Sequence, residues 1–356
     1  MLKKQNLFGL PREKLSKFFM NLNEKKFRTK QIMQWLYHQS ASNFDDMHNL
    51  PKDLRKKLQT IATIDLPKVV SLNQSSDGVI KWIIDLGKQS HIETVYIPER
   101  DRGTLCISSQ IGCALACTFC STGAQGFNRN LQSHEIIVQV IIAQNHLKSI
   151  EKRISNVVFM GMGEPLLNES SVYDACDLLL DDWAFGLSRR KVTVSSAGIV
   201  PAIYRMSEIT PVSLAISLHA PNNNLRDILV PINQKYPIKE LMKACHHYLN
   251  AGTQERHILF EYVMLDRVND LPEHAKTLAK LLNGISAKVN LIPFNPFPKT
   301  QYQTSKKDTI EHFQDILFKS GIRTTTRRTR GDDVDAACGQ LVGRVLDKTR
   351  RNAGRN

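Results

Sequence analysis

The feature that most constrains this chain is one short stretch that holds four of its seven cysteines. Cys106 opens the stretch, and Cys113, Cys117 and Cys120 follow with the spacing Cys-x-x-x-Cys-x-x-Cys. Three thiolates on a tight loop can ligate three irons of a four-iron cluster and leave the fourth iron open. The spacing therefore predicts a [4Fe-4S] site with Cys113, Cys117 and Cys120 as its ligands.

Three other uses of these cysteines need weighing. A zinc site usually combines two Cys-x-x-Cys or Cys/His ligand pairs. No second pair lies near here, because the next cysteine, Cys176, is in an apolar run. A disulfide framework is not expected in a long chain without a signal peptide. A redox pair of Cys117 and Cys120 would leave Cys113 unexplained. An open iron can instead hold a ligand that the cluster reduces, which is typical of enzymes that cleave S-adenosylmethionine (SAM) into a radical.

Length and composition predict a protein with a substantial core. The 356 residues suffice for one large α/β domain and a small one, and 42% of them are hydrophobic. No apolar run approaches the ~20 residues of a membrane span. The first residues lack an apolar signal region, so we expect a soluble cytoplasmic protein in which thiols stay reduced.

The charge balance indicates a polyanionic partner. Lysine and arginine number 48 against 34 aspartates and glutamates, a net charge of +14. Such an excess is typical of nucleic-acid binding, although a merely basic soluble protein fits the total equally well. The basic residues also cluster, which favours binding; the clusters are Lys25-Lys26, Arg55-Lys56-Lys57, Arg189-Arg190-Lys191, Arg327-Arg328 with Arg330, and Lys348 with Arg350-Arg351.

The first part of the chain reads as a small helical domain. Apolar residues recur at helical spacing around Leu15 and Phe19 and again around Ile32 and Trp35, with basic residues between them. We expect an RNA-binding accessory domain over residues 1–62, although a plain packing module fits the same pattern. Residues 63–98 then read as bridging strands, at 69–72, 79–84 and 92–97.

From residue 99 onward, predicted strands and helices alternate, and alternation implies a parallel sheet. The strands are expected at 104–108, 156–160, 191–195, 212–218, 257–265, 288–293 and 322–326. Six or seven such units predict a full or partial TIM-like (β/α) barrel. The fold class is therefore α/β, with a core domain at 99–340, the helical N-terminal domain, which we expect to be of helix-hairpin-helix type, and a basic tail at 341–356.

Candidate functional residues follow the predicted strands, where parallel barrels carry their chemistry. Gly163 exposes backbone beside the Glu164 carboxylate and could bind a cation such as the amino group of SAM; an ordinary turn is the alternative. Ser195, Ser217 and Asn295 suit ribose or carboxylate contacts, but each could also be a turn or cap residue. His219 could contact a ligand or be a buried histidine, and the sequence leaves both open.

The remaining cysteines fall into two groups. Cys106 and Cys338 each lie near a predicted strand end, and Cys338 is in a loop rich in Gly and Asp. Two thiols that face one pocket could form a transient disulfide; the alternative is two unrelated cysteines. Cys176 and Cys245 occupy apolar helical faces, where burial as small hydrophobic residues is expected.

Together these motifs resemble the RlmN/Cfr family of radical-SAM RNA methyltransferases over nearly the whole chain. The similarity is carried by residues 108–123, 159–165, 217–219, 292–296 and 330–340. It implies a partial barrel of the radical-SAM type that methylates carbon 2 of an adenine in 23S rRNA and in tRNA. The residues around Glu164-Pro165 and Asn295-Pro296 are more similar to the carbon-2 than to the carbon-8 enzymes of the family.

The resemblance also implies roles for individual residues. Cys338 would take a methyl group from one SAM, Cys106 would resolve the covalent intermediate by forming a disulfide, and Glu93 would accept a proton, so that two SAM are used per methylation. The implied SAM contacts are Gly163, Glu164, Ser195, Ser217, Leu218, His219 and Asn295. A flavodoxin- or ferredoxin-like electron donor and a monomeric state are expected. Carbon-8 methylation, or a non-catalytic RNA-binding protein with a structural cluster, remain the alternatives.

Overall fold

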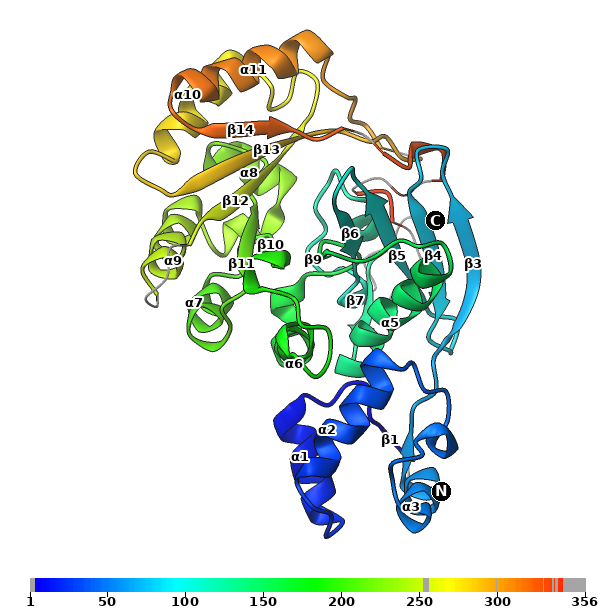
Figure 1. Ribbon diagram of the computed structural model, residues 1–356. Coiled ribbons are helices and arrows are strands. Elements are labelled where there is room, and N and C mark those ends of the chain that lie inside the picture. The colour runs from blue at the N-terminus through cyan, green and yellow to red at the C-terminus, as the bar shows by residue number, and fades with distance from the viewer. Residues whose placement is uncertain are drawn as a thin grey trace.

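The structure is a computed structural model, and it describes residues 4–251, 256–298, 300–328, 330–334, 336 and 339–341. A small helical unit lies at one end of a larger α/β body (Figure 1). In the small unit a short parallel pair, β1 (Gln5–Asn6) and β2 (Ala62–Thr63), closes around the helices α1 (Arg12–Asn21), α2 (Phe27–Met33) and α3 (Lys52–Ile61).

A ten-stranded sheet forms the centre of the larger body, in the order β14-β13-β12-β11-β10-β9-β6-β5-β4-β3. The strands from β6 to β14 run parallel, as the alternating pattern predicts, and β3, β4 and β5 join antiparallel at one edge. The parallel strands are β6 (Gly103–Cys106), β9 (Asn156–Phe159), β10 (Val192–Ser196), β11 (Ser213–Ser217), β12 (Ile258–Met264), β13 (Ala287–Pro293) and β14 (Arg323–Thr326).

The sheet curves without closing, so the predicted partial barrel is confirmed. Its edge strands are β14 and β3 (Lys68–Gln74), and β4 (Ile80–Asp85) and β5 (His91–Pro98) are the other two bridging strands. Helices cover the outer face of the sheet (Figure 1). They are α5 (Ser133–Ser149), α6 (Glu169–Leu180), α7 (Val200–Ile209), α9 (Ile238–Asn250), α10 (Pro272–Leu281) and α11 (Lys307–Lys319).

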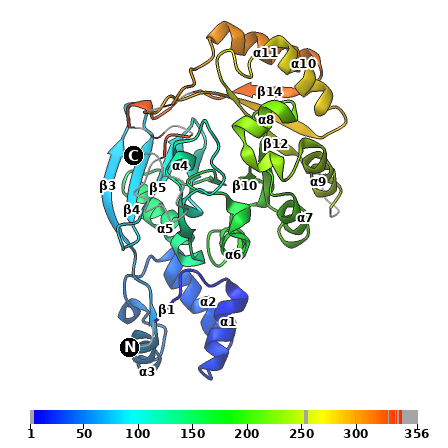
Figure 2. The same ribbon diagram turned by 180° about the vertical axis from the view of Figure 1, so that it is seen from behind.

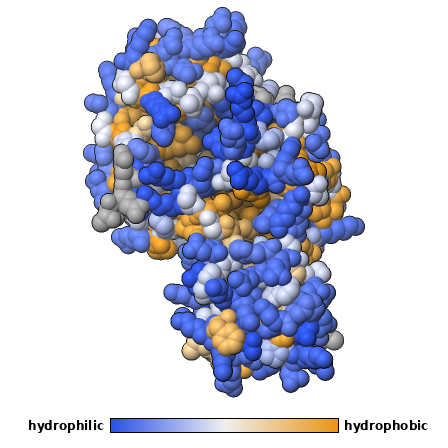
Figure 3. Space-filling view, viewed as in Figure 1, coloured by the Kyte–Doolittle hydropathy of each residue, from blue (hydrophilic) through white to orange (hydrophobic). Residues whose placement is uncertain are grey.

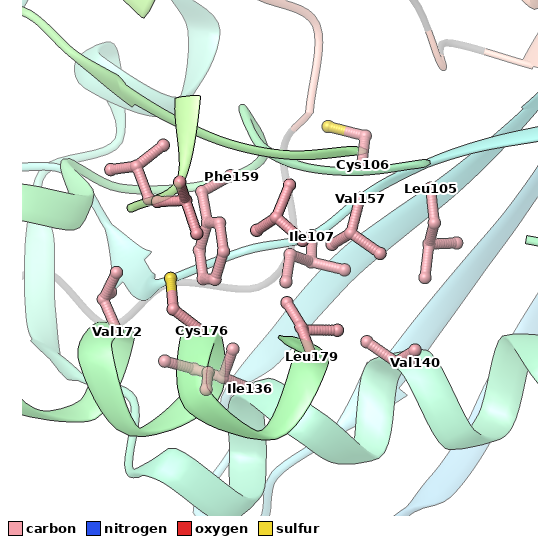
Figure 4. Close-up of a cluster of buried hydrophobic side chains, with 14 of the residues drawn as sticks. Leu105, Cys106, Ile107, Ile136, Val140, Val157, Phe159, Val172, Cys176 and Leu179 are labelled. Carbon is pink, nitrogen blue, oxygen red and sulfur yellow. The ribbon is translucent and has the colours of Figure 1, made fainter. Parts of the chain in front are cut away.

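The main core lies between the outer face of the sheet and these helices. Figure 4 shows Leu105, Ile107 and Phe159 packed toward α5 and α6, with Cys176 among the buried side chains of α6. Cys176 and Cys245 are completely buried, which confirms their interpretation as core residues. Cys106 alternates with Leu105 and Ile107, so its side chain leaves the strand on the opposite, inner face (Figure 4).

The helical unit packs tightly on the barrel. The Arg12 guanidinium forms an ion pair with Asp181 and lies 3.8 Å from the centroid of the Trp183 ring. Tyr37 stacks at a tilt on Phe185, with their ring centroids 5.3 Å apart. Buried residues of both parts belong to one continuous hydrophobic cluster, so the two parts are held in a fixed relation.

The segment after β14 crosses the open side of the sheet to the turn between β3 and β4 (Figure 1). The Gly331 amide donates to the Asp77 carboxylate at 3.0 Å, and the Asp333 carboxylate accepts from the Ser76 amide at 3.1 Å. Gly331 has a φ of +68°, a backbone conformation that glycine adopts without strain. The chain thereby bridges the two edges of the partial barrel.

Candidate active site

The predicted cluster ligands lie on a tight loop between β7 (Gln110–Gly112) and α4 (Ser121–Ala124). Figure 2 labels α4. The Cys113 amide donates to the Gly126 carbonyl at 2.7 Å, and the Cys120 amide donates to the Cys117 carbonyl at 3.2 Å. A Cβ on Gly123 would lie 3.2 Å from the Cys117 backbone, so the loop closes firmly on the turn that follows it. All three thiols are partly buried.

The three thiols are close enough to affect one another. Burial raises the pKa of Cys117 well above its usual value, and Cys113 and Cys120 raise it further. Burial also raises the pKa of Cys120, while the backbone N–H groups of Gly123 and Thr122 oppose this. Three mutually repelling thiolates need a cation among them, which fits an iron cluster.

No three His, Cys, Asp or Glu side chains of the described residues converge as the ligands of a single metal ion would. A purely thiolate donor set on one loop is the set that iron–sulfur clusters use, with each thiolate on a different iron. The cysteine loop therefore fits the [4Fe-4S] group that its spacing predicts.

The glycine loop after β9 is pressed against the segment that leads into the cysteine loop. A Cβ on Gly161 would lie 2.7 Å from the Ser108 hydroxyl, and a Cβ on Gly163 would lie 2.4 Å from the Gln110 Cβ. Gly163 also has a φ of +100°, which other residues rarely adopt. The amides of Ser109 and Gln110 both donate to the Met162 carbonyl, so the two loops form one unit.

Glu164 is a buried carboxyl group that ties this loop to β10. Its two oxygens accept from the amides of Leu166 at 3.0 Å and Ala197 at 2.8 Å. Burial raises the pKa of Glu164 to about 7, and these hydrogen bonds only partly oppose the effect. Each oxygen retains acceptor capacity, so a cation can still approach the carboxylate.

The predicted SAM contacts on the next strands lie near this loop. The Ser195 and Ser217 hydroxyls are 3.5 Å apart at the ends of β10 and β11. His219 is a buried histidine whose Nδ1 accepts from the Val263 amide at 3.0 Å. Burial and the nearby Arg226 lower the pKa of His219 to about 3, so the ring is neutral and carries its proton on Nε2.

His219 also contacts the cysteine loop, because its ring lies edge-on to Phe119 with centroids 4.6 Å apart. Leu218 is completely buried, and its amide donates to the Glu261 carbonyl at 3.0 Å. Asn295 is buried after β13 and lines the main cavity. The structure therefore brings the predicted SAM contacts to one end of the parallel strands, next to the cysteine loop.

Arg226 is a residue of this region that the sequence analysis missed. It lies on the short helix α8 (Asn223–Leu229) and is completely buried. Its guanidinium donates to the carbonyls of Ala197 at 2.7 Å, Leu218 at 3.0 Å and Ser217 at 3.1 Å. It thereby fixes the ends of β10 and β11. Three asparagines and Leu225 precede Arg226 and Asp227 follows it, a polar context that is typical of a solvated helix face, so nothing in the sequence marked this residue.

Cys106 and Glu93 share the inner face of the sheet. Cys106 is opposite Val95 on β5, two residues from Glu93, and residues directly opposite across two strands point to the same side. Glu93 is buried, and one of its carboxylate oxygens lies 3.7 Å from the Lys81 ammonium. Cys338 lies outside the described residues, although Gly339 is fixed beside the cysteine loop because its carbonyl accepts from the Ser121 amide at 2.8 Å.

A cavity of about 840 Å³ occupies the inside of the barrel. On the face seen in Figure 3, both hydrophilic and hydrophobic side chains surround the central hollow of the larger body. Two basic clusters that lie far apart in the sequence both line the cavity: Arg189 and Arg190 from one, and Arg327, Arg328 and Arg330 from the other. Val158, which is opposite Cys106, lines the same cavity. No helix of the described residues is long and apolar enough to cross a membrane.

Comparison with known proteins agrees with this geometry. The model of the radical SAM superfamily matches residues 107–282, and the model of the ribosomal RNA large subunit methyltransferase N-terminal domain matches residues 5–64. A solved structure of a radical SAM methyltransferase from Sphaerobacter thermophilus is 40% identical, with a TM-score of 0.89 over 95% of this chain and 99% of that one. Fold and cysteine loop thus define a radical SAM enzyme.

Sequence relatives narrow the class. The dual-specificity RNA methyltransferase RlmN of Vesicomyosocius okutanii is 67% identical over 98% of both chains. That of Ruthia magnifica is 64% identical over 99% of both, and that of Marinobacter nauticus is 51% identical over 98% of this chain and 95% of its own. The chain belongs to the RlmN family of SAM-dependent radical methyltransferases.

Proposed function

We propose that this enzyme methylates carbon 2 of an adenine in 23S rRNA and in tRNA. The relatives are dual-specificity RNA methyltransferases, which supports the substrate class. The basic walls of the cavity suit a polyanionic substrate, since clustered arginines attract phosphates. A cavity of about 840 Å³ can also admit a base that has been turned out of an RNA stack.

The observation that carries this proposal is the position of Cys106. It is a buried thiol outside the cluster loop, on the inner face of the barrel and near the buried Glu93 carboxyl group. Carbon 2 of adenine is electron-poor, so direct polar transfer of a methyl from SAM would fail. A protein thiol that takes the methyl first removes this difficulty, and a second thiol can then release the product.

In this mechanism the protein supplies two thiols and a base. Cys338 accepts a methyl from one SAM, and this methyl loses a hydrogen atom to the radical formed from a second SAM. Its carbon then bonds to carbon 2 of the ring, so a methylene group links the Cys338 sulfur to the base. Glu93 takes the ring proton, and one electron would leave the ring for the cluster that the cysteine loop would hold. Cys106 then attacks the Cys338 sulfur, the bond between that sulfur and the methylene breaks, the carbon takes up a proton to become the methyl group, and a disulfide remains. When bound by Cys113, Cys117 and Cys120, a [4Fe-4S] cluster would supply the electron that cleaves a second SAM. An external reductant restores the thiols.

The other residues of the site have binding roles. Gly163 and Glu164 would hold the amino end of SAM, and Ser195, Ser217 and Asn295 its polar groups. The helical N-terminal unit, at residues 1–62 in our division of the chain, would contribute to RNA binding. We further propose that a flavodoxin- or ferredoxin-like protein reduces the cluster and that the enzyme acts as a monomer.

The test is nucleoside mass spectrometry of RNA treated with the reconstituted enzyme, with the position of the methyl resolved. We expect 2-methyladenosine; 8-methyladenosine would indicate the carbon-8 reaction, and no methylated adenosine would indicate a non-catalytic RNA-binding protein. Cys106→Ala should trap a covalent protein–RNA adduct, whereas Cys338→Ala should give neither adduct nor product. Cys176→Ala is the matched control, because that thiol is buried on the opposite face of the sheet.

A further inference from the structure

A row of polar side chains crosses the inner face of the barrel, and the mechanism above uses only its first member, Ser217. In the register of the sheet, Ser217 is opposite Glu261, Glu261 is opposite Asn290, and Asn290 is opposite Thr325. Residues directly opposite on neighbouring strands point to the same side, so these four form one continuous row. The row begins at Ser217, a predicted SAM contact, and extends across β12, β13 and β14.

Glu261 is the member of the row that needs explaining. Its side chain is buried, at 7% exposed. Its neighbours in the strand, Phe260 and Tyr262, point to the opposite face, where Tyr262 packs on Phe313 of α11 with ring centroids 5.2 Å apart. Glu261 therefore faces inward, where it lines the cavity with Leu259. Burying a carboxylate is costly unless it gains hydrogen bonds, and an apolar residue would satisfy packing alone.

The two following residues orient this carboxyl group. The Thr325 hydroxyl donates to the Asn290 side-chain oxygen at 3.3 Å. The amide nitrogen of Asn290 is therefore the end that donates to the Glu261 carboxylate, to which Asn290 is hydrogen-bonded. Arg327 adds a favourable electrostatic interaction. A carboxylate has about four acceptor positions, so Glu261 keeps acceptors that face the cavity.

The walls around Glu261 suit a flat base that carries an amino group. Met160, Leu259 and Ile292 give the cavity apolar surface against which a ring can pack. Val158, opposite Cys106, lines the cavity from β9, while Glu261 lines it from β12. The cavity therefore has one wall next to Cys106 and another that carries Glu261, and a base inside it would lie between these walls.

We propose that Glu261, positioned by Asn290 and Thr325, accepts a hydrogen bond from the exocyclic amine of the target adenine and so selects adenine over 6-oxopurines. A 6-oxopurine would bring its carbonyl oxygen against the carboxylate, so two acceptors would meet. The inference rests on the proposed RNA methylation and adds to it the residue that reads the base. Nothing in the reaction itself requires this contact, which makes the contact separately testable.

The experiment uses the reconstituted holoenzyme and one RNA that the wild type methylates, synthesised with adenosine or inosine at the target position. We expect the wild type to favour adenosine by about a hundredfold or more in kcat/KM. Glu261→Gln should reduce that preference to about tenfold or less, because the glutamine amide can both accept from an amine and donate to a carbonyl. Comparing the two enzymes cancels the different intrinsic reactivities of the two bases.

Two further variants complete the design. Thr325→Val removes the hydrogen bond to the Asn290 side chain and leaves the Glu261 carboxyl group unchanged. It should lower the preference for adenosine over inosine by a smaller factor. This variant also keeps the test decisive if Glu261→Gln does not fold. Glu240→Gln removes an exposed glutamate on α9 and should leave the preference unchanged. For each enzyme, the ratio of the dissociation constants of the two RNAs, measured with SAM present, should rank the variants in the same order as the ratio of their kcat/KM values.

Two results would overturn the inference while leaving the proposed function intact. One is an unchanged adenosine preference in Glu261→Gln and Thr325→Val. The other is an equal loss with both RNAs together with weaker SAM binding, which would assign Glu261 to the SAM pocket. If the wild type methylates no RNA at all, the proposed function fails first, and this inference fails with it.

Discussion

The buried Glu164 carboxyl group should leave a measurable signature in the pH dependence of stability. Its pKa in the folded chain is about 7, against an ordinary value of 4.5. The folded chain therefore binds this proton more tightly than the unfolded chain does. The resulting contribution to stability is complete below pH 4.5 and is lost as the pH rises to about 7.

The magnitude follows from the difference between the two pKa values. A difference of about 2.5 at 1.36 kcal/mol for each unit gives about 3 kcal/mol at full burial. Glu164→Gln provides the reference, because glutamine has a similar shape and does not titrate. The free energy of unfolding of wild type minus that of the variant should therefore fall by about 3 kcal/mol between pH 4.5 and pH 8.

The assay is urea unfolding of the cluster-free protein at several pH values, followed by circular dichroism. Taking the difference between wild type and variant removes the contributions of all other titrating groups. A flat difference for Glu164→Gln, or one that rises with pH, would show that the carboxyl group is not held in a desolvated site.

Three other perturbations test the remaining parts of the site. Cys117→Ala should abolish cluster content, measured as bound iron and sulfide, because it removes the middle thiolate of the loop. Gly163→Ala should lower the thermal midpoint and the affinity for SAM, since its Cβ would lie 2.4 Å from Gln110 at a φ of +100°. Arg226→Gln should cost several kcal/mol of stability in urea unfolding, because it leaves buried carbonyls without their donor.

Local patterns predicted the scaffold well. The alternation of predicted strands and helices located the parallel strands. In the structure each of these strands begins and ends within a few residues of its expected position. The spacing of Cys113, Cys117 and Cys120 required a tight loop, and that loop is present. These features depend on neighbours in sequence, which is why one sequence suffices to find them. The assignment of Cys338 stays a prediction, because it lies outside the described residues.

Features that depend on register could not be predicted in the same way. Glu261, Asn290 and Thr325 form a row only because three strands pair at particular residues. A shift of one residue would turn Glu261 toward the helices and the hydrophobic core. His219 shows the same limit, since its neutral state follows from an amide on another strand and from burial.

The two ionisable groups beneath the predicted SAM pocket show how the fold accommodates charge there. The Ala197 amide donates to the Glu164 carboxylate, and the Ala197 carbonyl accepts from the Arg226 guanidinium. One residue therefore links a buried acid and a buried base. All hydrogen bonds that Arg226 makes in the described part of the chain go to uncharged oxygens, and among these are the carbonyls that end β10 and β11. Burial of an isolated cation is costly. Cys117 of the cysteine loop interacts electrostatically with Arg226, so the loop offsets that cost most fully when its thiols are ionised, which is the state that binds iron.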